Sequence, residues 1–312
     1  MRRFLGVVAL LLLGAVAVYG AFDFIFPEQF TAAALSAGRS YAGLQRKETE
    51  IPGFKVVYLD GGQGRPLLLL HGFGADKDNW IKVAPYLTPR YRVIAVDLPG
   101  FGESGRPSPG QCRIEDQLTY VSQIAAALGL QRFDLGGNSM GGWIAAAYAA
   151  AHPDQVSSLW LLAPAGVSTA DTSELGDIVK SGGHVPLITR TPQEYRQLVD
   201  FVFVHPPYLP HAMLKVMSDR QAQNYEFDQQ VFAELRNGPP LEPKLKDLAT
   251  PALVVWGDHD RALHYSGADV LQHLMPNAQV QIMPDVGHVP MLEAPAAVAA
   301  RYINFRESLS GR

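Results

Sequence analysis

The chain has 312 residues, of which 47% are hydrophobic and 18% charged, so it can bury one large core. Its 26 basic and 30 acidic residues give a net charge of -4 without long runs of one sign, which excludes nucleic acid as a partner. The single cysteine, Cys112, excludes an intrachain disulfide, and we expect it to be structural.

The first 26 residues predict a membrane anchor. Arg2 and Arg3 precede an uncharged apolar run from Phe4 to Phe22, which as a helix would be about 28 Å long and would nearly match a bilayer's hydrocarbon core. A signal peptide cleaved near Val18-Tyr19-Gly20 is the alternative. We favour the uncleaved anchor because the run is longer than a usual signal core and aromatic residues collect at its far end.

The position of the arginines predicts the orientation of this anchor. Arginines before the span, and none close after it, place the amino terminus in the cytoplasm and the rest of the chain outside. In a Gram-negative bacterium the protein would then be a single-pass inner-membrane protein with its folded part in the periplasm. If the segment is cleaved, the mature protein would instead be released into the periplasm.

A juxtamembrane helix is expected after the anchor, and we assign residues 27–50 to this region. Apolar residues recur every three or four positions from Pro27 to Leu44, which is the spacing of one helical face. The sequence leaves open whether the helix packs on the folded domain or lies in the lipid headgroup layer. Ala17 and Ala21, four positions apart, are a weak indication that two anchor helices could pair.

Strand and helix patterns alternate through the rest of the chain. Alternation from Phe54 to Leu59, a turn at Gly61-Gly62 and the apolar run from Pro66 to Leu70 predict an antiparallel hairpin that leads into the first buried parallel strand. The later alternation predicts an α/β fold with a mostly parallel sheet. Strands are expected at residues 92–96, 133–135, 158–162, 252–256 and 279–283, and helices near 114–128, 144–151, 266–274 and 297–309.

The strand pattern disappears between residues 166 and 244. Helical runs such as Gln193 to Val204 and His211 to Gln223 lie in this segment. They predict a helical cap inserted into the α/β core, which then consists of residues 51–165 and 245–312.

The motif Gly137-Asn138-Ser139-Met140-Gly141 marks the predicted nucleophile. A predicted strand ends in this G-x-S-x-G and passes directly into a predicted helix, and the small neighbours permit a turn tight enough to expose the Ser139 hydroxyl. The N–H group of Met140, at the start of the helix, is the predicted first donor to an oxyanion.

A serine nucleophile needs a histidine base and an acid that orients it. Asp260 and His288 each follow a predicted strand, at the edge where sites form in open α/β sheets. We predict Asp260 as the acid and His288 as the base. Asp258 remains an alternative acid, and His259 an alternative base.

The segment His71-Gly72-Phe73-Gly74 follows the strand that ends at Leu70. For a G-x-S-x-G turn on an α/β sheet, the second oxyanion donor comes from the loop after an earlier strand, so the N–H of Phe73 is our candidate, with His71 as a supporting residue. The sequence shows no cluster of metal-ligand residues, and we expect no metal.

Five motifs together resemble the α/β-hydrolase superfamily in its esterase and lipase branch, and the similarity spans Phe54 to the end of the chain. The order serine, acid, histidine is that of this superfamily. The anchor and helix before Phe54 further resemble the membrane-anchored bacterial phospholipases A. The motifs are Gly72-Phe73-Gly74, Asp97-Leu98-Pro99-Gly100-Phe101-Gly102-Glu103-Ser104, Gly137-Asn138-Ser139-Met140-Gly141-Gly142, Trp256-Gly257-Asp258-His259-Asp260 and Gly287-His288-Val289-Pro290-Met291-Leu292-Glu293.

This resemblance implies hydrolysis of acyl esters, with glycerophospholipids as the substrate class, through an acyl-enzyme and without a cofactor. It also implies membrane association and a homodimer formed through the N-terminal helices. A generic short-chain carboxylesterase would use the same triad. The serine motif also resembles C–C bond hydrolases of aromatic ring-fission products, but these are not expected to carry an anchor and tend to have a glycine pair where Ala75-Asp76-Lys77 stands. A binding protein without catalysis is disfavoured because no triad position is missing.

Overall fold

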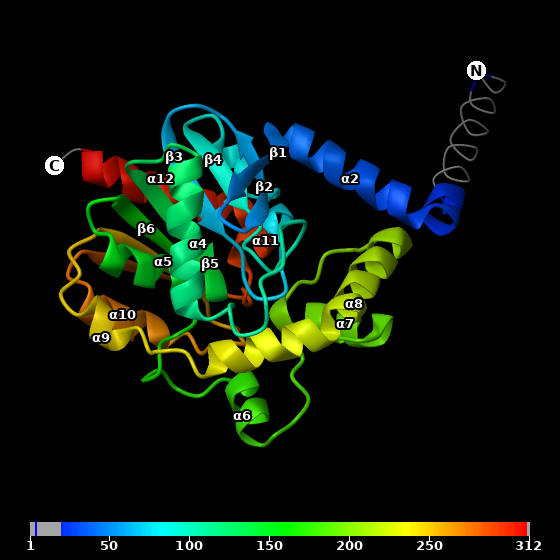
Figure 1. Cartoon of the computed structure of the whole chain (residues 1–312). Coiled ribbons are helices and arrows are strands. Elements are labelled where there is room, and N and C mark those ends of the chain that lie inside the picture. The colour runs from blue at the N-terminus through cyan, green and yellow to red at the C-terminus, as the bar shows by residue number, and fades with distance from the viewer. Residues whose placement is uncertain (1–3, 5–19, 311–312) are drawn as a thin grey trace.

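The computed structural model describes Phe4 and residues 20–310. One mixed sheet lies at the centre of this described part, with the strand order β1-β2-β4-β3-β5-β6-β7-β8 (Figure 1). β2 runs antiparallel to both its neighbours, β1 and β4, and all other neighbouring strands are parallel. The strands are β1 (Leu44–Ile51), β2 (Phe54–Gly61), β3 (Arg65–Leu70), β4 (Tyr91–Val96), β5 (Phe133–Asn138), β6 (Val156–Leu162), β7 (Ala252–Gly257) and β8 (Ala278–Met283).

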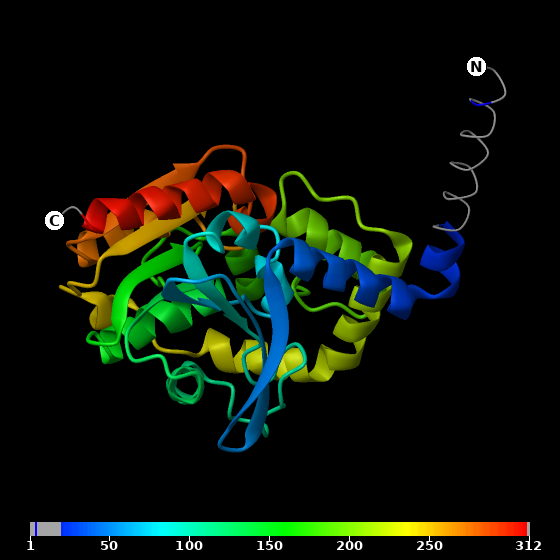
Figure 2. The ribbon, with the colours of Figure 1, turned by 90° about the horizontal axis from the view of Figure 1, so that it is seen from above.

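Helices cover both faces of the sheet, and a separate apolar core lies under each layer. Leu68 and Leu70 of β3 belong to one core, whereas Leu67 and Leu69 belong to the other, because successive side chains of a strand point to opposite faces. This explains the uninterrupted apolar run in β3. Figure 2 shows the sheet from above, with α12 in red along one side. One face carries α4 (Ile114–Ala127), α5 (Met140–Ala151) and α10 (Gly267–Leu274), and the other carries η1 (Lys77–Trp80), α3 (Ala84–Leu87), α11 (Pro290–Glu293) and α12 (Pro295–Ser310).

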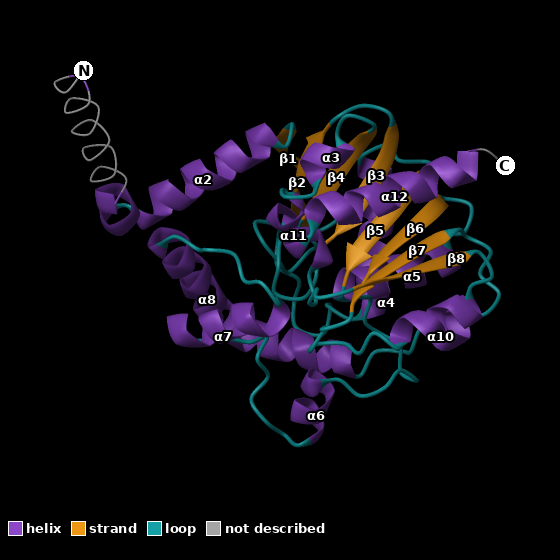
Figure 3. Cartoon of the chain, turned by 180° about the vertical axis from the view of Figure 1, so that it is seen from behind, coloured by secondary structure: helices purple, strands orange, loops and turns teal. Residues whose placement is uncertain are grey.

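Helices alone make up the regular structure of the cap, which is inserted between β6 and β7. They are α6 (Glu174–Lys180), α7 (Pro192–Val202), α8 (His211–Arg236) and α9 (Glu242–Leu245). The first three lie beyond the carboxyl ends of the parallel strands, whereas α9 packs beside α5 and α10 (Figures 1 and 3). α8 runs past the predicted end at Gln223 to Arg236. The predicted mostly parallel α/β sheet is therefore confirmed, with a helical segment inserted where the sequence predicts the cap.

The helix predicted after the anchor is shorter than expected. α2 covers Pro27–Tyr41, and residues 44–50, which we assigned to the juxtamembrane region, belong to strand β1. Gly43, with φ of 68°, separates helix from strand in a conformation that favours glycine. β1 lies at the edge of the sheet and buries only its two end residues, so its sequence lacks the alternation that would have revealed it.

The prediction that β2 forms a hairpin with β3 is wrong. β2 pairs along its whole length with β1 and not with β3, which lies between β4 and β5. The Gly61-Gly62 segment therefore connects two strands that are not neighbours in the sheet. Sequence alone could not show this, because the true partner strand is polar.

No helix within residues 20–310 is long and apolar enough to cross a membrane. The predicted anchor falls largely on residues 5–19, which lie outside the described residues. The short helical segment at residues 20–25 directly precedes α2, and it exposes the apolar side chains of Phe22, Phe24 and Ile25.

Candidate active site

Ser139 occupies a sharp turn between β5 and α5. Its φ of 53° and ψ of -116° are strained values for a residue with a side chain, and such strain is characteristic of functional sites. A Cβ atom at Gly137 would lie 2.2 Å from the carbonyl oxygen of Gly141, and one at Gly141 would lie 2.2 Å from that of Leu70. The turn therefore requires glycine at both positions, and it leaves the Ser139 side chain half-buried.

Asp260 and His288, predicted from separate loops, are brought together by the fold. Nδ1 of His288 lies 2.8 Å from Oδ2 of Asp260, and both side chains are buried. The same carboxylate accepts hydrogen bonds from Nε1 of Trp256 and from the N–H groups of Ala262 and Leu263. These contacts fix the carboxylate so that it can hold the imidazole with Nδ1 protonated and Nε2 free to accept a proton.

The rival residues Asp258 and His259 lie away from this pair. They contact each other, with 2.6 Å between Oδ1 of Asp258 and Nδ1 of His259, and 60% of the His259 side chain is exposed. Asp258 also accepts a hydrogen bond from the N–H of Asp285, so its role is to shape the loop. The geometry favours Asp260 and His288.

Asn138 connects the serine turn to the histidine loop. Its Nδ2 donates hydrogen bonds of 3.0 Å to the carbonyl oxygens of both Leu162 and His288. Ser139 is the next residue, so the amide of Asn138 fixes the spacing between the proposed nucleophile and base. Among the described residues, no hydrogen bond joins the Ser139 hydroxyl to the His288 ring, and such catalytic bonds often tighten only when substrate is bound.

The two predicted oxyanion donors belong to the segments on either side of Ser139. Met140 is the first residue of α5, where the N–H groups have no partner within the helix. The loop after β3 approaches from the other side, since a Cβ atom at Gly72 would lie 3.4 Å from Cβ of Ser139. The N–H of Phe73 follows this point of closest approach.

His71 supports this loop and is not a second base. Nδ1 lies 2.7 Å from the carbonyl oxygen of Gly72, and Nε2 accepts a hydrogen bond from the N–H of Leu98. Burial lowers the pKa of His71 to about 4, so the ring is neutral at physiological pH and ties the loop after β3 to the loop after β4. His71 therefore contacts both loops, and the role of Phe73 as oxyanion donor stays a prediction.

A model of the α/β hydrolase fold matches residues 65–295. The chain belongs to the α/β-hydrolase family. Lipase 1 of Psychrobacter immobilis is 38% identical over 268 residues, which are 83% of each chain. Human monoacylglycerol lipase ABHD6 is 30% identical over 263 residues, 79% of this chain and 78% of that protein. The crystal structure of a membrane phospholipase A, a bacterial virulence factor, matches with a TM-score of 0.90 and 42% identity over 100% of both chains.

These similarities confirm the resemblance to esterases and lipases, and to a membrane phospholipase A in particular. The protein is a lipase-like α/β hydrolase. Among the described residues of this hydrolase, no group of three or more His, Cys, Asp or Glu side chains could hold a metal ion. The thiol of Cys112 is buried, and burial raises its pKa to about 12, so it has no nucleophilic role at neutral pH.

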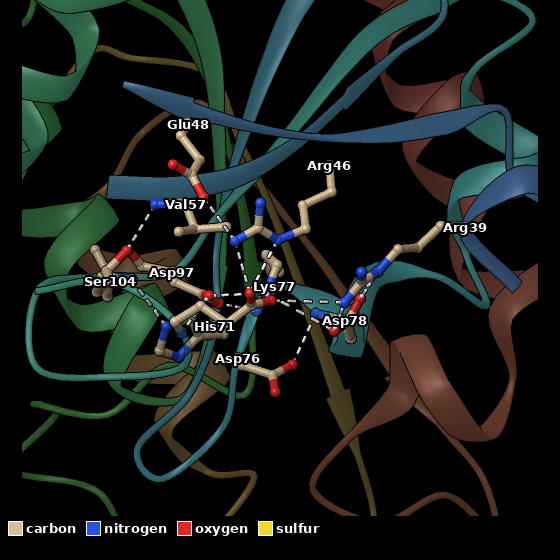
Figure 4. Close-up of polar contacts among 12 residues, drawn as sticks. Arg39, Arg46, Glu48, Val57, His71, Asp76, Lys77, Asp78, Asp97 and Ser104 are labelled. Atoms are coloured by element: carbon tan, nitrogen blue, oxygen red, sulfur yellow. Dashed lines mark hydrogen bonds and ion pairs between the residues drawn. The ribbon is translucent and has the colours of Figure 1, made fainter. Parts of the chain in front are cut away.

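The sequence analysis missed a buried charge network beside the loop after β3, which carries the predicted oxyanion donor Phe73 and is called the oxyanion loop below. Nζ of Lys77 lies 2.8 Å from Oδ2 of Asp97 (Figure 4). The same Nζ atom lies 2.7 Å from Oε1 of Glu103. Asp97 also accepts hydrogen bonds from the N–H groups of Lys77 and Glu103. Burial alone would lower the pKa of Lys77, but the surrounding carboxylates, chiefly Asp97, raise it above its ordinary value, so Lys77 stays charged.

Arginines from outside the core extend this network toward the surface. Arg39 of α2 makes two hydrogen bonds to Asp78, and Arg46 of β1 donates to Glu103 (Figure 4). The segment Asp97 to Ser104 matched the family motif, but its pairing with Lys77 was not predicted. The charged residues directly after the oxyanion loop could have indicated this network, because lysine and aspartate are almost never fully buried unless they are paired.

The cap contacts the oxyanion loop through α8. Nε2 of Gln221 donates a 2.8 Å hydrogen bond to the carbonyl oxygen of Gly74. The ring of Phe232 packs edge-on against that of Phe73, with 5.5 Å between the ring centres. Both contacts involve the loop that carries the predicted oxyanion donor, so the position of α8 and that of the loop depend on each other.

Proposed function

We propose that this α/β hydrolase cleaves the carboxylic acyl esters of glycerophospholipids with Ser139 as nucleophile, His288 as base and Asp260 as the orienting acid. The observation that carries the proposal is the buried hydrogen bond between Nδ1 of His288 and Asp260, formed between loops that also flank the strained Ser139 turn. This is the arrangement of acid, base and nucleophile that acyl transfer requires.

The proposed reaction has two steps. In the first, Nε2 of His288 takes the proton of the Ser139 hydroxyl as Oγ attacks the ester carbonyl carbon, and the N–H groups of Phe73 and Met140 donate to the oxyanion. The bond to the alcohol oxygen then breaks, and His288 returns the proton to the leaving alcohol. In the second step His288 takes a proton from water as the water oxygen attacks the acyl carbon. The bond from this carbon to Oγ of Ser139 then breaks, and His288 returns the proton to Oγ, so that the carboxylic acid leaves and Ser139 is regenerated.

Phospholipid as substrate is supported by the similarity to a membrane phospholipase A over the whole chain and by the apolar run at residues 4–22. We propose that this run anchors the protein in the bacterial inner membrane, with the hydrolase domain in the periplasm. Pairing of two chains through their N-terminal helices is part of the same proposal. The anchor would raise the local concentration of lipid at the site, whereas a soluble ester would gain nothing from it.

A substrate panel tests the proposal. Full-length protein in mixed micelles should hydrolyse p-nitrophenyl esters and release fatty acid from phosphatidylethanolamine and phosphatidylglycerol vesicles, and the Ser139→Ala variant should do neither. Hydrolysis of short esters without release from phospholipid would leave a generic carboxylesterase. Cleavage of a ring-fission product in preference to every ester would identify the C–C bond hydrolase alternative.

A further inference from the structure

The start of α8 is capped by a residue from the N-terminal segment, far away in the sequence. Pro210 precedes the helix and offers no side-chain hydrogen bond to its first N–H groups. The carboxylate of Asp23 takes this place, with 2.7 Å between Oδ1 and the N atom of Ala212 and 3.3 Å between Oδ2 and the N atom of His211. A helix leaves its first four N–H groups without partners, and a carboxylate at this end satisfies two of them and interacts favourably with the helix dipole.

Two further features indicate a built contact. Asp23 is only 6% exposed, although its neighbours in this short segment, Phe22 and Phe24, are 37% and 66% exposed. The ring of Phe24 stacks on the ring of His211, with 4.2 Å between centres and 14° between planes. The helical residues 20–25 therefore lie directly against the start of α8, as Figures 1 and 3 show from opposite sides.

α8 carries this contact to the active site. With 26 residues the helix is about 39 Å long, and it contacts the oxyanion loop at two places beyond its first turns. These are the hydrogen bond from Gln221 to Gly74 and the packing of Phe232 on Phe73. The helix bends along its length, as Figures 1 and 2 show, but it is one continuous hydrogen-bonded element, so we expect a shift at His211 to be transmitted to the loop.

The same N-terminal segment is also fixed at its other end. Arg39, in the last turn of α2, forms a bidentate pair with Asp78, which follows the oxyanion loop directly. Residues 20–41 thus connect the start of α8 to the base of the loop that α8 contacts. The N-terminal segment and α8 therefore contact each other, and both also contact the part of the chain around Phe73, the proposed oxyanion donor.

We propose that Asp23 is a positioning residue which, by capping α8 from the N-terminal segment, holds the cap against the oxyanion loop in its active position. The expected effect on kcat rests on the proposed function, whereas the expected effect on the stability of the first turn of α8 does not. In this proposal, residues 20–25 help to position the oxyanion loop and also link the folded domain to the predicted anchor.

The test uses the full-length protein in detergent micelles and three substitutions in the N-terminal segment. Asp23→Ala removes the cap, and Asp23→Asn keeps a good helix-capping side chain. Glu28→Ala is the matched control, because it removes the same charge from the first turn of α2, where the side chain is exposed. Amide hydrogen exchange of residues 211–214 reports the helix start, and kcat and KM on a short p-nitrophenyl ester report the loop.

We expect Asp23→Ala to speed exchange at residues 211–214 by roughly fivefold, the effect of losing one helix cap. Its kcat should fall by about three- to tenfold with little change in KM, because oxyanion stabilisation acts in the transition state. Asp23→Asn should stay within about twofold of wild type on both measurements. A further variant, Gln221→Leu, should lower kcat similarly without speeding exchange at the helix start.

Three results would overturn the proposal. Exchange in Asp23→Ala that matches Glu28→Ala would show that Asp23 does not hold α8. Faster exchange with unchanged kcat would show that α8 does not transmit the contact to the loop. A defect in Asp23→Asn as large as that in Asp23→Ala would mean that charge, and not capping, is responsible. If the wild-type protein hydrolyses no ester, the proposed function fails, and the exchange comparison still decides whether Asp23 caps α8.

Discussion

The Nζ atom of Lys77 lies 2.8 Å from the Oδ2 atom of Asp97, and the two side chains are only 1% and 0% exposed. Lys77 follows the loop that carries Phe73, and Asp97 follows β4, so this buried ion pair joins the oxyanion loop to the neighbouring strand. Breaking a buried pair leaves one charge uncompensated, which is far more costly than losing a surface pair.

We predict that Lys77→Met lowers the free energy of unfolding by about 3–5 kcal/mol and that adding Asp97→Asn restores part of the loss. Urea unfolding of the single and double variants measures both effects. Lys55→Met is the control, since Lys55 contacts Glu48 at the surface and its loss should cost less than about 1 kcal/mol. A double variant less stable than Lys77→Met would contradict the uncompensated-charge explanation.

Asp228 provides a second buried charge, but without a hydrogen-bond partner among the described residues. It lies on α8 with 3% exposure, and burial raises its pKa to about 7, with a smaller opposing effect from Arg106. The folded protein therefore keeps the proton up to about pH 7, whereas the unfolded chain loses it near pH 4. Asp228 therefore lowers the free energy of unfolding progressively as the pH rises from about 4 to 7.

We predict that Asp228→Asn stabilises the protein and that its advantage over wild type grows by about 2–3 kcal/mol between pH 5 and pH 8. Urea unfolding at both pH values measures this difference. Asp219→Asn on the same helix is the control, because Asp219 is exposed and should show a much smaller pH-dependent difference. An advantage of Asp228→Asn that is constant with pH would show that Asp228 is already ionised throughout.

The catalytic assignment is tested by removing each side chain in turn. Ser139→Ala and His288→Ala should each lower kcat on p-nitrophenyl esters by about 10³-fold or more, and the double variant should be no worse, because triad members act as a unit. Asp260→Asn should also lose most of its activity, whereas Asp258→Asn should retain it. Circular dichroism checks that each variant folds. The reverse result for the two aspartates would transfer the role of acid to Asp258.

The sequence predicted the parts of this protein whose side chains follow a strict local pattern. Buried parallel strands such as β3 appear as continuous apolar runs, and the Ser139 turn requires glycines at fixed positions. The edge strand β1 was missed because only its two end residues are buried and its sequence therefore does not alternate, and this error also gave β2 the wrong partner. Contacts between distant segments, such as Asp23 with Ala212, leave no local pattern and become visible only in the fold.

The contact between Asp23 and α8 changes how the predicted anchor has to be tested. Removing residues 1–27 would delete the apolar run at residues 4–22 and the cap of α8 together, so a loss of activity would not identify the cause. Two truncations separate them. A chain that begins at Gly20 retains Asp23 and Phe24, whereas a chain that begins at Glu28 lacks both.

We predict that the chain beginning at Gly20 stays soluble without detergent, keeps most of its turnover on a short p-nitrophenyl ester and loses most of its turnover on phospholipid vesicles. The tether raises the concentration of lipid near the site but does not act on a soluble substrate. The chain beginning at Glu28 should in addition lose about three- to tenfold of its soluble-ester turnover, because α8 has lost its cap. Intact mass of the native protein is measured alongside. A native protein that starts near Ala21, or undiminished vesicle hydrolysis by the chain from Gly20, would contradict the anchor and leave a periplasmic esterase whose cap still depends on Asp23.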